Sequence, residues 1–129
     1  MKFKEQAIRQ STKIVSLPAI YSPRCDKAIF NHINNKKTMI RLNVFVRVNE
    51  TNREKAIEAA KELTACSLKE EGCIAYDTFE SSTRRDVFMI CETWQNAEVL
   101  AAHEKSAHFA QYVGIIQELA EMKLEKFEF

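Results

Sequence analysis

The chain has 129 residues, of which 46% are hydrophobic and 29% are charged, and its formal net charge is +1. This length fits one domain with its own core. Its apolar runs fall far short of the roughly 20 residues that a transmembrane helix needs. The apolar segment 14–20 contains Pro18 and lacks a small-residue cleavage site behind it, so we expect neither a membrane span nor a signal peptide.

Charge divides the chain into two parts. Residues 1–38 carry eight Lys or Arg against two acidic residues, whereas residues 39–129 carry 11 basic and 16 acidic residues. A basic arm can contact nucleic acid, but the acidic domain behind it would repel phosphate, so no nucleic-acid partner is expected. We interpret residues 1–38 as a weakly structured basic N-terminal extension and residues 39–129 as the organised domain.

The four cysteines show no C-x-x-C pair and no zinc-ribbon spacing. We expect them to be small buried side chains of a cytoplasmic protein rather than disulfide partners. They are Cys25, Cys66, Cys73 and Cys91.

The organised domain begins with a strand and a helix. Residues 39–48 alternate, with Ile, Leu and Val at the even positions, as in a strand with one buried face. The sequence TNRE at 51–54 has the pattern of a capping box and predicts a helix from Thr51. Apolar residues then recur at helical spacing, and Gly72 is the expected stop.

The second half of the domain repeats this pattern with two strands first. Segments 73–81 and 87–94 read as strands joined by a polar hairpin. Residues 96–104 read as a helix, and Ser106 is placed to cap a second helical piece at 107–121. Residues 122–129 read as a last strand whose alternation slips, which predicts a bulge or a crossing onto a partner.

The order β-α-β-β-α-β predicts an α+β fold of the ferredoxin-like, split βαβ type. Helices on one face of four strands leave the other face apolar and uncovered. A second copy of the chain is the simplest cover, so a homodimer, a dimeric α+β barrel, is expected.

His103 and His108 lie five residues apart in the C-terminal helical region. On a continuous helix their rings would point about 140° apart, unlike the four-residue spacing of zinc-protease histidines. A break at Ser106 could bring them together, but no third ligand is evident, and we expect no metal. An acid–base pair over a pocket and plain helix surface remain the other interpretations.

Glu92 and Trp94 lie two apart on a predicted strand and share one face with Phe88 and Ile90. A carboxylate among large apolar groups is costly unless a donor is near. The two histidines, in the element that folds back over this strand, are natural partners.

Three segments together resemble the antibiotic biosynthesis monooxygenase (ABM) family and its quinol monooxygenase-like members. They are KEEGCIAYDTFES, ETW and LAAHEKSAHF, in order, within residues 39–129. The resemblance implies a dimeric barrel that oxygenates a small phenolic or quinol substrate with O2 and uses neither metal nor cofactor. In such chemistry the protein deprotonates the substrate and shelters the anion, and imidazole suits the base.

The resemblance also implies site residues. His108 and His103 would be catalytic, with His108 as the base, because it begins a helical piece where the dipole favours a neutral ring. The implied substrate-binding residues are Asn43 and Trp94, and we expect Phe45 and Glu92, on the same two strands, to join them.

Two other functions stay open on the same residues. One is an isomerase of a small carbonyl or phosphorylated metabolite, which would borrow Arg41 or Arg47 for phosphate. The other is a non-catalytic dimeric small-molecule binder, with haem as a candidate ligand.

The N-terminal extension is predicted to be dispensable. A chain that begins at Met39 should unfold at a similar temperature, because the first strand begins there. Thermal unfolding of both chains checks this, and a drop of more than about 10 °C would show that the extension stabilises the domain by several kcal/mol.

Overall fold

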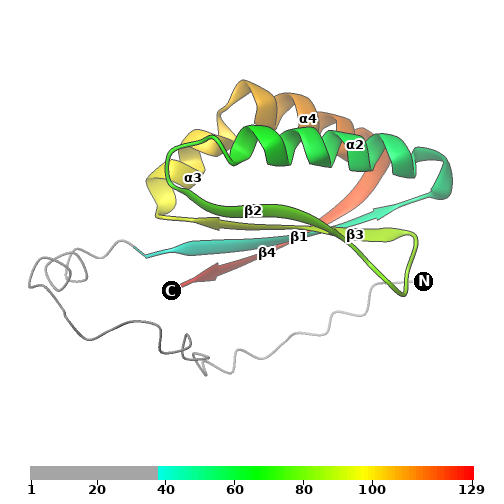
Figure 1. Cartoon of the computed structure of the whole chain (residues 1–129), viewed down its shortest axis with the longest axis horizontal. Coiled ribbons are helices and arrows are strands. Elements are labelled where there is room, and N and C mark those ends of the chain that lie inside the picture. Colours follow the sequence, from blue (N-terminus) through cyan, green and yellow to red (C-terminus); the bar gives the residue numbers. More distant parts are fainter. Residues whose placement is uncertain (1–37) are drawn as a thin grey trace, which may run out of the picture. The chain divides into compact units, whose positions relative to one another are not determined.

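The computed structural model describes residues 38–129, which form a four-stranded antiparallel sheet with three helices on one face (Figure 1). The strand order is β2-β3-β1-β4, which confirms the predicted ferredoxin-like α+β fold. The predicted extension lies outside the described residues except for Thr38. No described helix is long and apolar enough to cross a membrane. The elements are β1 (Ile40–Val48), α2 (Glu50–Ser67), β2 (Cys73–Glu80), β3 (Val87–Trp94), α3 (Ala97–Glu104), α4 (Ala107–Leu119) and β4 (Ala120–Glu128).

The core lies between the sheet and the helices. The even positions of β1 and β3 face the helices, because Leu42 pairs with Glu92 and Val44 with Ile90 in the same register. Apolar residues of α2, such as Leu63, cover them. The buried apolar residues are Ile40, Leu42, Val44, Val46, Val48, Ala56, Ile57, Ala59, Ala60, Leu63, Tyr76, Phe88, Ile90, Trp94, Leu100 and Ile116.

The start of α2 differs from the predicted capping box. The cap lies two residues earlier, at Asn49 in place of Thr51, so the helix begins at Glu50, and the Asn49 side chain accepts a hydrogen bond from the backbone N–H of Asn52 at 2.9 Å. Asn is as good a cap as Thr, and Asn49 directly follows the last residue of β1. The chain therefore turns from strand to helix without an intervening loop.

Gly72 fixes the turn between α2 and β2. Its φ of +80° is a left-handed conformation that glycine adopts readily. A Cβ built on it would lie 2.6 Å from Cγ1 of Val99 in α3, and its carbonyl accepts the backbone N–H of Gln95 at 2.9 Å. This turn is thus held closely against the beginning of α3.

The last strand is regular, so the predicted slip is corrected. β4 pairs with β1 continuously, from Val48 opposite Ala120 to Ile40 opposite Glu128, without a bulge. The irregularity lies instead in β2, between Cys73 and Ala75. The apparent change of phase arises because Met122 and Phe127 lie on opposite faces of one regular strand.

The sheet face that points away from the helices mixes apolar and charged side chains. Phe45, Phe79, Met89 and Phe127 share this face by register with Arg41 and its neighbours. Phe79 is 51% exposed. The face is therefore less apolar than the sequence pattern predicted, although its aromatic residues are accessible.

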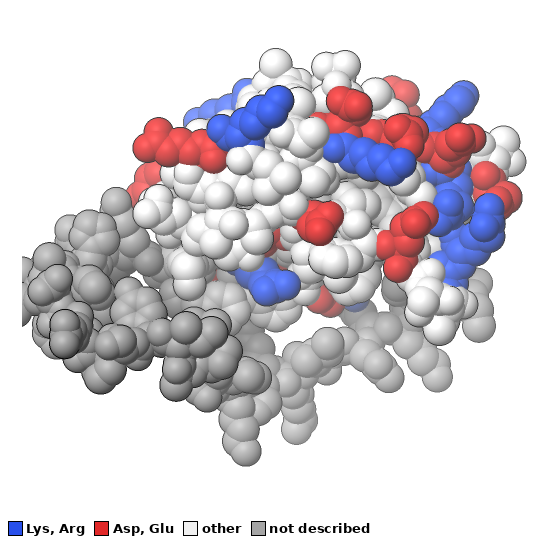
Figure 2. Space-filling model, in the orientation of Figure 1, with Lys and Arg blue, Asp and Glu red and all other residues white. Residues whose placement is uncertain are grey.

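Charges of both signs are interspersed on the surface of the described residues in Figure 2. Several form exposed pairs, including Arg85 with Glu50 at 2.8 Å and Lys61 with Glu58 at 2.6 Å. Exposed pairs contribute little to stability. The fold therefore depends on the apolar layer between sheet and helices.

Candidate functional site

The site begins at the end of β3, where period-two alternation points Glu92 and Trp94 toward the helices. Trp94 is fully buried and Glu92 is 5% exposed. The indole Nε1 donates to Oε2 of Glu92 at 2.7 Å. This hydrogen bond supplies one of the donors that a buried carboxyl group needs.

Burial raises the pKa of Glu92 to about 7. The Trp94 hydrogen bond opposes this shift, whereas the negative charges of Glu104 and Glu70 add to it. Glu92 can therefore exchange a proton near neutral pH.

Ser106 breaks the helix between the two histidines. Its side chain accepts the N–H of Phe109 at 3.2 Å, which caps α4, and its hydroxyl donates to the carbonyl of His103 at 2.6 Å. The break turns the imidazole rings of His103 and His108 toward each other, with ring centroids 5.9 Å apart. A continuous helix would have kept them apart.

Glu70 joins the two rings. It lies in the turn between α2 and β2, and its Oε1 contacts Nδ1 of His103 at 2.7 Å and also Nε2 of His108. A carboxylate oxygen accepts hydrogen bonds, so these two nitrogens carry the protons.

The opposite nitrogen of His103 is left without a partner. Nε2 of His103 is buried, forms no hydrogen bond, and lies 3.8 Å from Oε2 of Glu92. With the proton on Nδ1, a neutral ring presents a lone pair at Nε2. The ring lies against Trp94 at a centroid distance of 4.4 Å, and Phe109 contacts it edge-on at 5.1 Å. The arrangement is a fixed imidazole with one unoccupied acceptor.

A cavity of about 210 Å³ lies between the sheet and the helices, and His103 is one of the residues that line it. Its polar lining includes Tyr76, Glu92 and His103, and burial raises the pKa of Tyr76, which keeps the phenol neutral. The apolar lining residues are Leu42, Val44, Leu63, Ile90, Leu100, Phe109, Val113, Met122 and Leu124.

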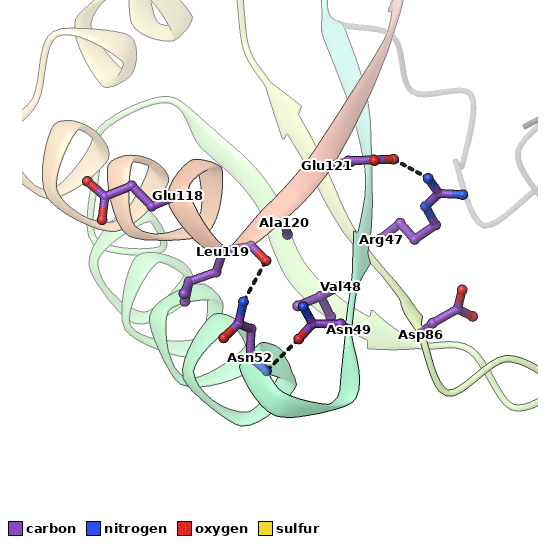
Figure 3. Close-up of a pocket in the computed structure, with 9 residues that line it drawn as sticks. All are labelled: Arg47, Val48, Asn49, Asn52, Asp86, Glu118, Leu119, Ala120 and Glu121. Carbon is purple, nitrogen blue, oxygen red and sulfur yellow. Dashed lines mark hydrogen bonds and ion pairs between the residues drawn. The ribbon is translucent and has the colours of Figure 1, made fainter. Parts of the chain in front are cut away.

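A larger and more open depression of about 590 Å³ lies near the other end of β1 (Figure 3). Some of its polar groups are engaged with one another: Arg47 pairs with Glu121, and Asn52 donates to the carbonyl of Leu119 at 3.4 Å. It contains no histidine or other group suited to proton transfer near pH 7. We therefore place the candidate site in the smaller cavity.

The structure brings four of the six expected site residues together: Glu92, Trp94, His103 and His108. His108 touches Glu70 but does not line the cavity.

Asn43 and Phe45 are not brought to the cavity. They lie on the sheet face that points away from the helices, where Asn43 accepts the thiol of Cys91 at 3.2 Å. The odd positions of β1 project away from the face that carries Glu92.

Sequence reasoning missed Glu70 and Tyr76. Glu70 belongs to the KEEG segment that carries the family resemblance, but it lies in a turn 33 residues before His103. Periodicity does not detect such a residue. Tyr76 could have been found, because it pairs with Glu92 across neighbouring strands.

The fold and the site together define a small ferredoxin-like domain with a histidine–carboxylate pocket between sheet and helices. The model of the family described as antibiotic biosynthesis monooxygenase (ABM) matches residues 39–114. The chain belongs to the ABM family.

Two relatives show the range of similarity. "Putative monooxygenase YcnE" of Bacillus subtilis (strain 168) is 31% identical over 87 residues, covering 67% of this chain and 92% of that protein. A solved structure from Bacteroides thetaiotaomicron VPI-5482, described as a conserved protein and "Possible Oxidoreductase", is 97% identical with a TM-score of 0.71. The match covers 72% of this chain and 99% of that one.

A more distant solved structure shares the fold alone. The conserved protein from Methanosarcina mazei Go1 is 24% identical with a TM-score of 0.67, and the match covers 70% of this chain and 92% of that one.

Glu92 should make stability depend on pH. Its folded pKa of about 7 exceeds the ordinary 4.5, so its contribution is most favourable below 4.5 and is lost as pH rises toward 7. Glu92→Gln keeps an oxygen for Trp94 but does not titrate. Relative to wild type, the variant should gain about 2 kcal/mol between pH 5 and pH 8. Thermal unfolding with chelator present measures this gain, with Glu71→Gln as the exposed control. A difference that does not change with pH contradicts the prediction.

Proposed function

We propose that the chain is a cofactor-independent monooxygenase that oxygenates a small phenol or quinol with O2 in the cavity beside His103. The observation that carries this proposal is the buried Nε2 of His103, which forms no hydrogen bond while Glu70 holds Nδ1, in a residue that lines the cavity. The family description and the names of YcnE and the Bacteroides relative support oxidoreductase chemistry.

The reaction begins with transfer of a proton. Nε2 of His103 takes the proton of the substrate hydroxyl, and Glu70 stabilises the resulting imidazolium at Nδ1. The face of Trp94 lies against the same ring and further favours a cation there. Of the two histidines, His103 thus has the geometry of a base, in place of the expected His108.

Oxygen then reacts with the substrate anion. The anion transfers one electron to O2, and the substrate radical and superoxide combine to form a carbon–oxygen bond. Loss of water from the peroxide leaves a carbonyl group, so a phenol and O2 give a quinone and water. The substrate supplies all four electrons, and no other reductant is required.

The size and lining of the cavity favour a small aromatic substrate. Its volume of about 210 Å³ lies below the roughly 300–1,000 Å³ of typical drug-sized sites. Most of its wall is apolar, which excludes water from the reactive anion. A substrate of one or two rings suits this space better than haem.

The isomerase alternative has less support. Arg41 lies on the opposite sheet face and donates to the thiol of Cys91 at 3.6 Å, and Arg47 pairs with Glu121 at the larger depression. Neither arginine lines the cavity beside His103.

Substitution of the histidines tests the base assignment. His103→Ala should lower kcat for a reduced naphthoquinone by about 10²-fold or more, because the acceptor of the proton is lost. His108→Ala should cost less, because His108 contacts Glu70 and the His103 ring but does not line the cavity. Oxygen uptake with chelator present is the measurement, and His32→Ala is the control. Circular dichroism verifies that each variant is folded.

Two results would contradict this. Equal oxygen uptake by wild type and His103→Ala removes the base assignment. No uptake by wild type across a panel of phenols and quinols favours a non-catalytic binder.

We also propose that the chain forms a homodimer through the sheet face that carries Phe45, Phe79, Met89 and Phe127. The exposed Phe79 and the half-buried Phe45 and Phe127 support this, since a second sheet would cover them. Phe79→Lys should weaken association at least tenfold. Leu68→Lys, at a similarly exposed position after α2, should not. Sedimentation at micromolar concentration measures the mass, and a monomeric wild type would overturn the proposal.

A further inference from the structure

The residues in contact around Glu70 are also a set of potential metal ligands. Oε1 of Glu70, Nδ1 of His103 and Nε2 of His108, which come from a turn and two helices, can all lie within 4.8 Å of one another. Two imidazoles and one carboxylate are a donor set that binds Zn²⁺ in catalytic zinc sites. Mg²⁺ and Ca²⁺ prefer oxygen ligands, so the set favours a zinc-type ion.

The geometry requires only a small adjustment. Ligand atoms around a tetrahedral zinc ion with bonds of about 2.1 Å lie about 3.4 Å apart. Nδ1 of His103 and Oε1 of Glu70 are now 2.7 Å apart. Rotation of the Glu70 carboxylate, whose side chain is 18% exposed, can supply the difference.

The burial of the three ligands is graded. The His103 side chain is 1% exposed, whereas that of His108 is 25% exposed. An ion can therefore enter from the side of His108 and Glu70, and water can serve as a further ligand there. His103 forms the closed inner wall.

Metal binding would also make Nε2 of His103 a hydrogen-bond donor to Glu92. When Nδ1 of a histidine binds a metal, its proton resides on Nε2 and usually points to a carboxylate or carbonyl. Nε2 of His103 lies 3.8 Å from Oε2 of Glu92 and has no other partner. The bound ion would thus give Glu92 the outer role of a carboxylate–histidine–zinc arrangement.

We propose that Glu70, His103 and His108 bind one zinc-type divalent cation, and that the bound ion inhibits the monooxygenase. Inhibition follows because the ion places a proton on Nε2 of His103, the atom that must accept one from the substrate. Only this inhibition rests on the proposed function; ion binding does not.

Binding is tested on the full, tag-free chain after removal of metals with a chelator. Calorimetric titration with ZnCl2 should show one ion per chain. Glu70→Gln and His108→Ala should each weaken binding at least about tenfold. The matched control, Glu71→Gln at the exposed neighbouring position, should bind as wild type does. Both altered ligands are partly exposed, and circular dichroism verifies that the variants are folded.

A second readout separates this site from loose surface binding. Co²⁺ in place of Zn²⁺ should give the visible absorption of a four- or five-coordinate site in wild type, and the spectrum should be lost in Glu70→Gln. Equal zinc affinity in wild type and Glu70→Gln, or no saturable binding by wild type, overturns the proposal.

Inhibition is measured separately, by oxygen uptake with and without zinc. Uptake that falls in proportion to zinc occupancy supports the inhibitory role, and uptake that is unchanged at full occupancy overturns it. If wild type shows no uptake on any substrate, the proposed function fails, while the binding experiment still decides whether the ion site exists.

Discussion

The hydroxyl group of Ser106 serves two helices, and the whole site depends on this arrangement. It accepts a hydrogen bond at the start of α4 and donates one to the carbonyl of His103 near the end of α3. Without the break, the five-residue spacing would direct the two imidazoles to different sides of one helix. With it, a single carboxylate oxygen of Glu70 contacts both rings. The Ser106 side chain thereby divides this region into two helices, and each helix contributes one histidine to the polar cluster around Glu70.

The buried end of this cluster holds polar groups that are incompletely hydrogen-bonded. Glu92 lies in an apolar layer with Trp94 as its one hydrogen-bond donor, and Nε2 of His103 approaches without reaching it. In the monooxygenase reaction, Nε2 of His103 would accept a proton from the substrate hydroxyl. With a metal ion on Nδ1, Nε2 would instead carry a proton and point it toward Glu92. The two proposals therefore describe alternative states of the same imidazole, and they exclude each other at a single nitrogen.

Alternation and capping in the sequence were sufficient to predict the fold, and four of the six residues expected at the site lie together in the structure. The strand at 87–94 was predicted with its observed bounds, and the Ser106 cap is confirmed. Other features depend on contacts that no local pattern encodes. Glu70 lies in the turn after α2 and meets His103 only because this turn lies against α3. The cap at Asn49 was hidden by a better-known motif at Thr51. Asn43 was assigned by resemblance and Phe45 with it on the same strand, although the alternation of that strand already placed both on the other face.

Gly72 helps to set the distance between Glu70 and His103. It lies two residues after Glu70, and a Cβ at this position would meet Val99, which precedes His103 by one turn of α3. The carbonyl of Gly72 also holds the N–H of Gln95, just before that helix. The acid and the imidazole are therefore set at their distance by a glycine that has no side chain and takes no part in proton transfer. A single added methyl group there would push α3 outward and separate the His103 ring from the carboxylate of Glu70.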